Sequence, residues 1–115
     1  MAADRNITGD HLLSPAYHSC IGPSPGNSEI GQCLETEVER QEGALNEAYR
    51  LVMAHLTPPR REALRASERQ WIKERKRACD LAYKEMEGGT GDGIAHDICT
   101  ASRAILRTRW IEHFR

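Results

Sequence analysis

Apolar residues recur every three or four positions along three stretches of this chain, and this spacing constrains the fold more than any other feature. It is the spacing of residues that share one face of an α-helix. The first stretch covers residues 28–56, the second about 59–87 and the third about 94–114. The sequence therefore predicts three long helices and an all-α fold.

Proline and glycine separate the three predicted helices. Thr57-Pro58-Pro59 ends the first helix and opens the second, because proline is tolerated in the first turn of a helix but not in its interior. Residues 88–93 include four glycines, which end the second helix. Short turns between long helices indicate antiparallel neighbours, so we expect a three-helix up-down-up bundle.

The first 28 residues show no sustained periodicity. We interpret residues 1–28 as an irregular N-terminal arm and residues 29–115 as the helical bundle, together forming a single domain. The net charge of −1 gives no overall field that would attract nucleic acid or a membrane surface. No run approaches the roughly 18 apolar residues that a membrane-spanning helix needs.

The four cysteines, Cys20, Cys33, Cys79 and Cys99, fit two disulfides in an oxidising compartment; four free thiols in a cytosolic protein are the alternative. None has the Cys-x-x-Cys spacing of a zinc site or a redox pair. With a turn near residue 89, Cys79 and Cys99 each lie about ten residues from it, at the same height on adjacent helices. This favours Cys79–Cys99 with Cys20–Cys33. Cys33 and Cys79 are also nearly level, so Cys33–Cys79 with Cys20–Cys99 is the second choice.

No arrangement of residues typical of an active site is present. The five histidines lack the His-x-x-x-His spacing of a metal site, and the glycines at 88–93 lack the lysine of a phosphate-binding loop. We therefore expect a protein that is not an enzyme and needs no metal or cofactor. The basic residues near Trp71 surround the helix instead of lining one side, so we expect no nucleic-acid binding.

Polar residues on the predicted buried faces are expected to fix the register of the helices. Arg75 lies on the apolar stripe one heptad after Glu68. The sequence predicts a partly buried network that joins these two residues with Asn46 or Tyr49. Trp71 and Tyr49 are expected to lie in the core.

Two aromatic residues of the third predicted helix are harder to place in a core. Trp110 and Phe114 lie close to the end of the chain, where neighbouring helices offer less cover. An exposed aromatic pair at this position would mark an interface with another molecule.

Three motifs extend over most of the chain: Leu45-Asn46-x-x-Tyr49-x-x-Val52-Met53, then Leu64-x-x-x-x-Arg69-x-Trp71-Ile72-x-x-Arg75-x-x-x-Cys79, then Gly88-Gly89-Thr90 with Cys99 and Arg107. In these motifs, residues 20–112 resemble the LprI-like lysozyme-inhibitor family. The resemblance implies a small helical bacterial protein of the periplasm or cell surface, from which a signal peptide has been removed. For the namesake members it implies inhibition of lysozyme and no enzyme activity.

The resemblance and the lack of a catalytic arrangement lead to one expected function. We expect an exported protein that binds a muramidase or another wall-hydrolase toxin, as a lysozyme inhibitor or as an immunity protein. The alternative is a structural or chaperone-like envelope protein. Two surfaces are candidates for the partner: a glycine-rich turn with Gly89, Thr90 and Asp92, and an acidic face with Glu35, Glu39 and Glu42.

Overall fold

Five helical segments build the structure, a computed structural model that describes residues 7–85 and 92–115. They are the 3₁₀ helix η1 (Ile7–Leu12) and the α-helices α2 (Pro15–Ile21), α3 (Asn27–Met53), α4 (Pro58–Glu85) and α5 (Asp92–Glu112). No strand occurs in these two ranges. The prediction of an all-helical fold is therefore confirmed.

The N-terminal arm is more regular than the sequence predicted. Residues 7–12 form η1, and α2 begins after Ser14, whose hydroxyl oxygen accepts a hydrogen bond from the Tyr17 amide at 3.2 Å. Pro15 occupies the first turn of α2, where its fixed φ favours the helix. The prediction of an irregular arm is wrong for this part, because seven residues make only about two turns and cannot show a periodic stripe.

The long helices begin and end close to the predicted positions. Helix α3 starts at Asn27 with Gly26 as its N-cap, one residue before the predicted stretch begins at residue 28. Helix α4 starts at Pro58, directly after Thr57. The two helices are therefore joined by only a few residues, as the pair of prolines predicted.

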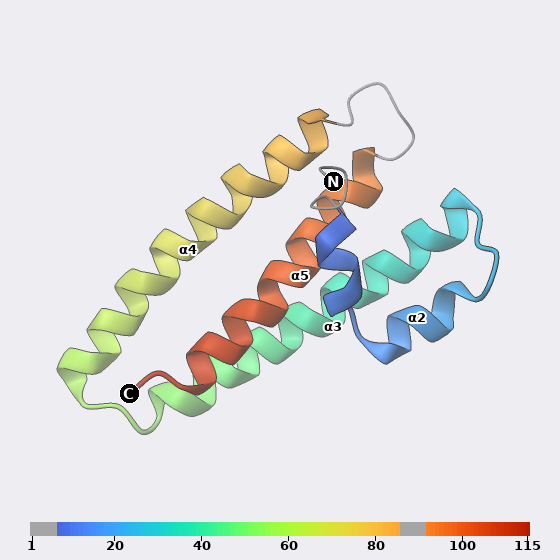
Figure 1. Cartoon of the computed structure of the whole chain (residues 1–115). Helices are drawn as coiled ribbons and strands as arrows, with labels where there is room; N and C mark the ends of the chain where they lie inside the picture. The colour runs from blue at the N-terminus through green and yellow to red at the C-terminus, as the bar shows by residue number, and fades with distance from the viewer. Residues whose placement is uncertain (1–6, 86–91) are drawn as a thin grey trace.

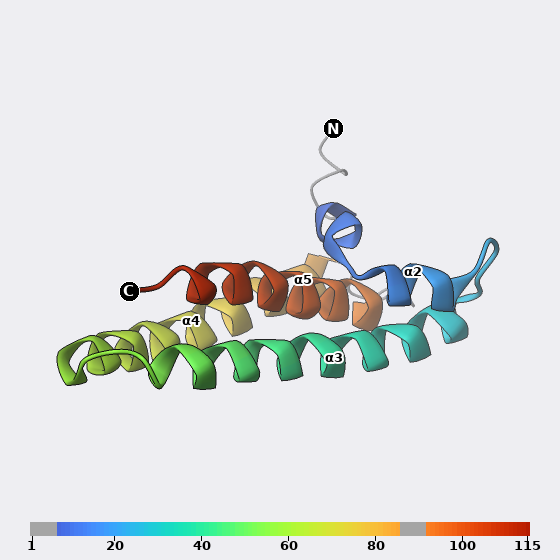
Figure 2. The ribbon, with the colours of Figure 1, turned by 90° about the horizontal axis from the view of Figure 1, so that it is seen from below.

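Helix α5 lies between α3 and α4 and packs closely against both of them (Figure 1). Helices α3 and α5 run in one direction and α4 runs in the opposite direction, while α3 and α4 diverge from the turn that joins them (Figure 1). The view from below shows α2 beside the first half of α3, with η1 above α5 (Figure 2). A bundle in which all three long helices pack on one another along their length stays a prediction.

Two groups of buried apolar side chains form the core. The first group joins η1, α2, α3 and α5 and includes Leu13, Tyr17, Cys33, Leu34, Ala101 and Ile105. The second group lies near the α3–α4 turn and includes Leu45, Ala48, Leu56, Leu64, Ala104 and Ile111. Alanines contribute to both groups at positions of α5, which lets this central helix approach its neighbours closely.

Both disulfides join helices that follow each other in the chain. Cys20 of α2 is bonded to Cys33 of α3, and Cys79 of α4 is bonded to Cys99 of α5. This is the pairing that the predicted helix lengths favoured. The first disulfide therefore closes the α2–α3 hairpin and the second closes the α4–α5 hairpin. No helix in the described ranges is long and apolar enough to cross a membrane.

Candidate functional site

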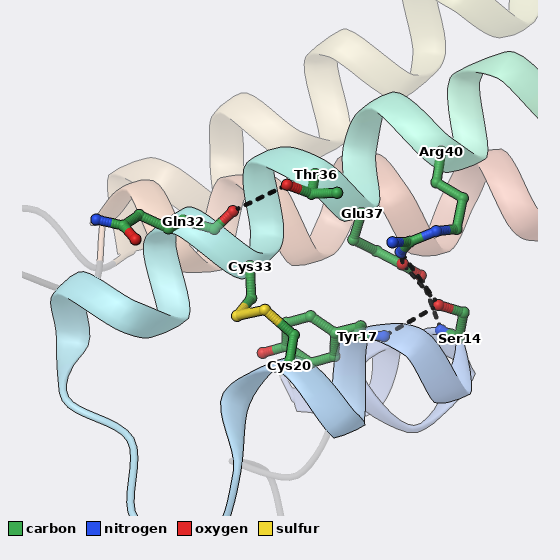
Figure 3. Close-up of a disulfide and its surroundings, with 8 residues drawn as sticks. All are labelled: Ser14, Tyr17, Cys20, Gln32, Cys33, Thr36, Glu37 and Arg40. Atoms are coloured by element: carbon green, nitrogen blue, oxygen red, sulfur yellow. Dashed lines mark hydrogen bonds and ion pairs between the residues drawn. A yellow bond between two sulfur atoms is a disulfide. The ribbon is translucent and has the colours of Figure 1, made fainter.

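Helix α2 is fastened to α3 at both of its ends (Figure 3). At its start, the Ser14 amide and hydroxyl donate to the two carboxylate oxygens of Glu37 at 2.8 and 2.7 Å. At its end, the Cys20–Cys33 disulfide holds the last turn. The buried Tyr17 ring lies between these two attachments, on the side of α2 that faces α3 (Figure 3). We call the Ser14–Glu37 contact and the disulfide together the α2 clamp.

Glu37 is fully buried but remains a carboxylate. Burial raises the pKa of a carboxyl group, but here hydrogen bonds from Ser14, Gln41 and Arg40 outweigh it and hold the pKa of Glu37 below its ordinary value. Gln41 donates from its side-chain amide at 3.1 Å, and Arg40 forms an ion pair with the same carboxylate. The negative charge also lies at the N-terminal end of α2, where the unpaired amides favour it.

This arrangement predicts a pH-dependent stability. Because the pKa of Glu37 is lower in the folded chain, its carboxylate stabilises the fold above about pH 4.5, and the contribution is lost as the pH falls through the lowered pKa. Urea unfolding at pH 7 and pH 3 of the parent chain and of Glu37→Gln measures this. The parent should be clearly more stable at pH 7, and the difference should shrink at pH 3. An equal difference at both values would contradict the prediction.

The three residues of the predicted acidic face differ in their exposure and in their partners. Glu35 and Glu39 are exposed on α3. Glu42 is half-buried and forms an ion pair with Arg75 of α4, which also donates to the carbonyl oxygen of Thr100 at 3.4 Å. Only Glu35 and Glu39 of the three are therefore left to meet a partner.

More acidic residues lie near Glu35, at the end of the molecule where α5 begins. His96 lies between two carboxylates, with Nε2 3.5 Å from Asp80 Oδ1 and Nδ1 3.8 Å from Asp97 Oδ1. Burial raises the pKa of Asp97, the charge of His96 opposes this, and that of Glu35 adds to it. The hydrogen bond from Lys76 at 2.7 Å lowers the pKa of Asp80, with a smaller contribution from His96.

The glycine-rich candidate surface falls largely outside the described residues. Gly89 and Thr90 are not among them, and Asp92 is the first residue of α5, but the position of its side chain is not described. The proposed role of this turn therefore stays a prediction. In the described part of the chain, no three His, Cys, Asp or Glu side chains are placed to hold a metal ion.

The predicted network around Arg75 has different partners from those expected. Arg75 pairs with Glu42 of α3, whereas Glu68 pairs with Arg107 of α5 at 2.9 Å. The prediction that Arg75 and Glu68 join each other is wrong, because two turns of one helix separate them by about 10 Å and each reaches a nearer charge on a neighbouring helix. Asn46, the other predicted member, is exposed.

Trp71 and Tyr49 are both half-buried, and both pack against the second group of core residues. The Arg75 guanidinium lies over the Trp71 ring at 4.5 Å from its centroid. Arg75 and Trp71 are thus joined by a ring contact, which the sequence did not predict.

A longer arrangement continues from Trp71 to the end of α5. Arg107 lies 5.6 Å from the centroid of the Trp71 ring and 4.0 Å from that of Trp110. The Trp110 and Phe114 rings are 5.3 Å apart, and the Arg60 guanidinium lies 4.7 Å from the Phe114 centroid. We call this series the arginine–aromatic ladder; its members are Arg75, Trp71, Arg107, Trp110, Phe114 and Arg60.

The two ends of the ladder differ in charge and exposure. At the inner end the charge of Arg107 is paired and its side chain is buried, whereas at the outer end the Trp110 ring is exposed to solvent. Arg107 is only 9% exposed and donates to Glu68 and to the Ser67 hydroxyl at 2.8 Å. Trp110 is 44% exposed. The spacing of Arg107 and Trp110, three residues apart on one helix, could have indicated this contact from sequence. The contacts with Trp71 and Arg60 depend on how α4 and α5 pack.

Comparison with known protein families gives a match over most of the chain. The family model for Lysozyme inhibitor LprI matches residues 20–111. This range extends from the end of α2 to nearly the end of α5 and contains all four cysteines and most of the ladder. The chain matches none of the curated proteins and none of the solved structures with which it was compared.

Proposed function

Because the chain belongs to the lysozyme inhibitor LprI family, we propose that it is an exported protein that binds and inhibits a lysozyme-type muramidase. The family match carries this proposal, since it covers most of the chain and the family is one of inhibitors. An inhibitor acts by binding, and a rigid scaffold reduces the entropy lost when the complex forms. The α2 clamp and the Cys79–Cys99 disulfide provide such a scaffold.

The disulfides and the family both indicate a location outside the cytoplasm. We propose the periplasm or the extracellular medium, reached with a signal peptide that is then removed. In either place the protein would meet a muramidase before or at the cell wall. It would act against a host lysozyme or, as an immunity protein, against the secreted toxin of a rival bacterium.

The exposed acidic side chains support recognition of a basic enzyme. Glu35 and Glu39 lie one helical turn apart on α3, and both are exposed. Opposite charges on two partners accelerate their encounter, mainly at low salt. We propose that these two residues attract the basic outer surface of the enzyme.

A panel of purified muramidases tests the proposed function. We expect the chain to slow peptidoglycan lysis by at least one of them at micromolar concentration and to co-elute with it from a size-exclusion column. An unrelated wall hydrolase that is not a muramidase serves as the control for non-specific binding. The proposal would be contradicted if the chain slowed lysis by none of the muramidases and co-eluted with none of them. Co-purification with other envelope proteins would then favour a structural or chaperone-like role.

A further inference from the structure

The outer end of the arginine–aromatic ladder has features of a binding surface. Trp110 is 44% exposed, and Leu106, one turn earlier on the same face of α5, is 49% exposed. Phe114 is half-buried next to Trp110. Tryptophan and arginine are the residue types that contribute most often to the energy of protein interfaces.

These side chains are held in place before any partner arrives. Trp110 lies between the guanidinium of Arg107 and the ring of Phe114. Arg107 is fixed in turn by Glu68 and Ser67. An exposed ring that is already fixed loses little conformational freedom on binding, so more of its contact energy is available for affinity.

Arg60 gives the outer end a positive charge. Its Nε donates to the carbonyl oxygen of Arg115 at 2.9 Å, and its guanidinium lies over Phe114. Among the described residues, no aspartate or glutamate side chain forms an ion pair with Arg60. An arginine has five N–H donors, so most of those of Arg60 remain for a group from another molecule.

The surroundings of Arg60 have the same sign of charge. The first two turns of α4 and the last three of α5 lie at the same end of the molecule (Figure 1). They carry the arginines Arg60, Arg61, Arg65, Arg103 and Arg109, as well as Arg107, whose charge is already paired with Glu68. The acids in the same turns are only Glu62 and Glu112. This end therefore complements a negatively charged surface.

The catalytic cleft of a muramidase is such a surface. Glycoside hydrolases of this kind place a pair of carboxyl groups on either side of the scissile bond, in a groove shaped for sugar rings. Flat rings fit the groove, and a guanidinium binds a carboxylate through two parallel hydrogen bonds. The acidic residues Glu35 and Glu39 would be repelled by the same carboxylates, so they suit the enzyme's outer surface instead.

We propose that the outer end of the ladder is the part that blocks the enzyme: Trp110 and Phe114 occupy sugar subsites of the cleft, and Arg60 binds a catalytic carboxylate. This inference rests on the proposed function and specifies the surface that performs it. The inner ladder residues, Arg75, Trp71 and Arg107, act as positioning residues that hold Trp110 in place.

The inhibition constant for a muramidase from the panel tests the role of the ring. Trp110→Ala should weaken inhibition about 30-fold, as expected for a central interface residue. Trp110→Phe should retain most of the inhibition because it keeps a flat ring. Leu81→Ala is the matched control, since Leu81 is 55% exposed on α4 and lies outside the ladder. Circular dichroism and the unfolding temperature should show that each variant is folded.

A charge reversal tests the role of Arg60. Arg60→Glu should weaken inhibition at least tenfold, because it places a carboxylate against the catalytic pair. Arg77→Glu, at an exposed arginine of α4 outside the ladder, makes the same charge change and should have little effect. A soluble chito-oligosaccharide that fills the cleft should compete with the parent chain for the enzyme.

The outcomes separate this inference from the proposed function. If the parent chain inhibits a muramidase and Trp110→Ala and Arg60→Glu inhibit it equally well, the assigned surface is wrong and the proposed function stands. The same conclusion follows if the parent still binds an enzyme whose cleft is filled by oligosaccharide. If the parent inhibits no muramidase, both the proposed function and the surface are wrong.

Discussion

Replacing Arg107 by alanine is expected to lower the free energy of unfolding by about 3 kcal/mol, because it leaves the carboxylate of a nearly buried ion pair without its partner. Glu68, 2.9 Å from Arg107, has a side chain only 16% exposed and would lose its charged neighbour. Trp71 and Trp110 would also lose the guanidinium that lies over both rings. Urea unfolding followed by circular dichroism measures the loss.

Two further variants show where this energy comes from. Arg103→Ala removes an exposed arginine one turn earlier on α5 and should change stability by no more than about 0.5 kcal/mol. Adding Glu68→Ala to Arg107→Ala should recover part of the loss, because the unpaired carboxylate is then gone. A loss below about 1 kcal/mol for Arg107→Ala would mean that the pair is solvated and does not fix the packing of α4 on α5.

Removing the disulfide between α4 and α5 is expected to have an effect of similar size. Closing a loop of about 20 residues restricts the unfolded chain by roughly 3 kcal/mol, so Cys79→Ala with Cys99→Ala should lower the unfolding free energy by about this amount. Cys79 is 1% exposed, and the smaller alanine side chain adds a packing cost there. Thermal unfolding of the double variant, with and without reductant, measures the change.

The effect of reductant on the parent chain and on the double variant serves as the control. Reductant should lower the unfolding temperature of the parent chain strongly. The double variant retains Cys20–Cys33, so reductant should still lower its unfolding temperature, but by less than in the parent. If the parent and the double variant unfolded at the same temperature without reductant, the cross-link would add nothing to the stability of the fold.

The long helices could be predicted from sequence, whereas α2 could not. A helix of 27 or 28 residues repeats its apolar stripe many times, so α3 and α4 are evident within a few residues of their ends. Helix α2 has seven residues, too few for a repeat. The sequence feature that marks the start of α2 is Ser14 followed by Pro15, an N-cap and a first-turn proline. Two residues alone do not predict a helix, and the contact of Ser14 with Glu37 of α3 is visible only in the structure.

The polar contacts were harder to predict than the helices. The stripe of α4 correctly indicated that Glu68 and Arg75 lie toward the protein interior. It could not give their partners, because these depend on how each helix is rotated against its neighbour. Glu42 was predicted to lie on an acidic face for a partner and instead binds Arg75. The ladder needed the packing of α4 on α5, since two of its contacts, Arg107–Trp71 and Arg60–Phe114, join α4 to α5 or to the residues that follow it.

The pairing of neighbouring cysteines has a consequence for how the protein matures. Cys20 pairs with Cys33, the next cysteine in the chain, and Cys79 with Cys99, the one that follows it. A chain that enters an oxidising compartment from its N-terminus exposes its thiols in this same order. Oxidation of each pair as it emerges gives the native bonds directly, so no wrong disulfide has to be exchanged later. For a chain oxidised in this order, an oxidase is sufficient and a disulfide isomerase is not needed.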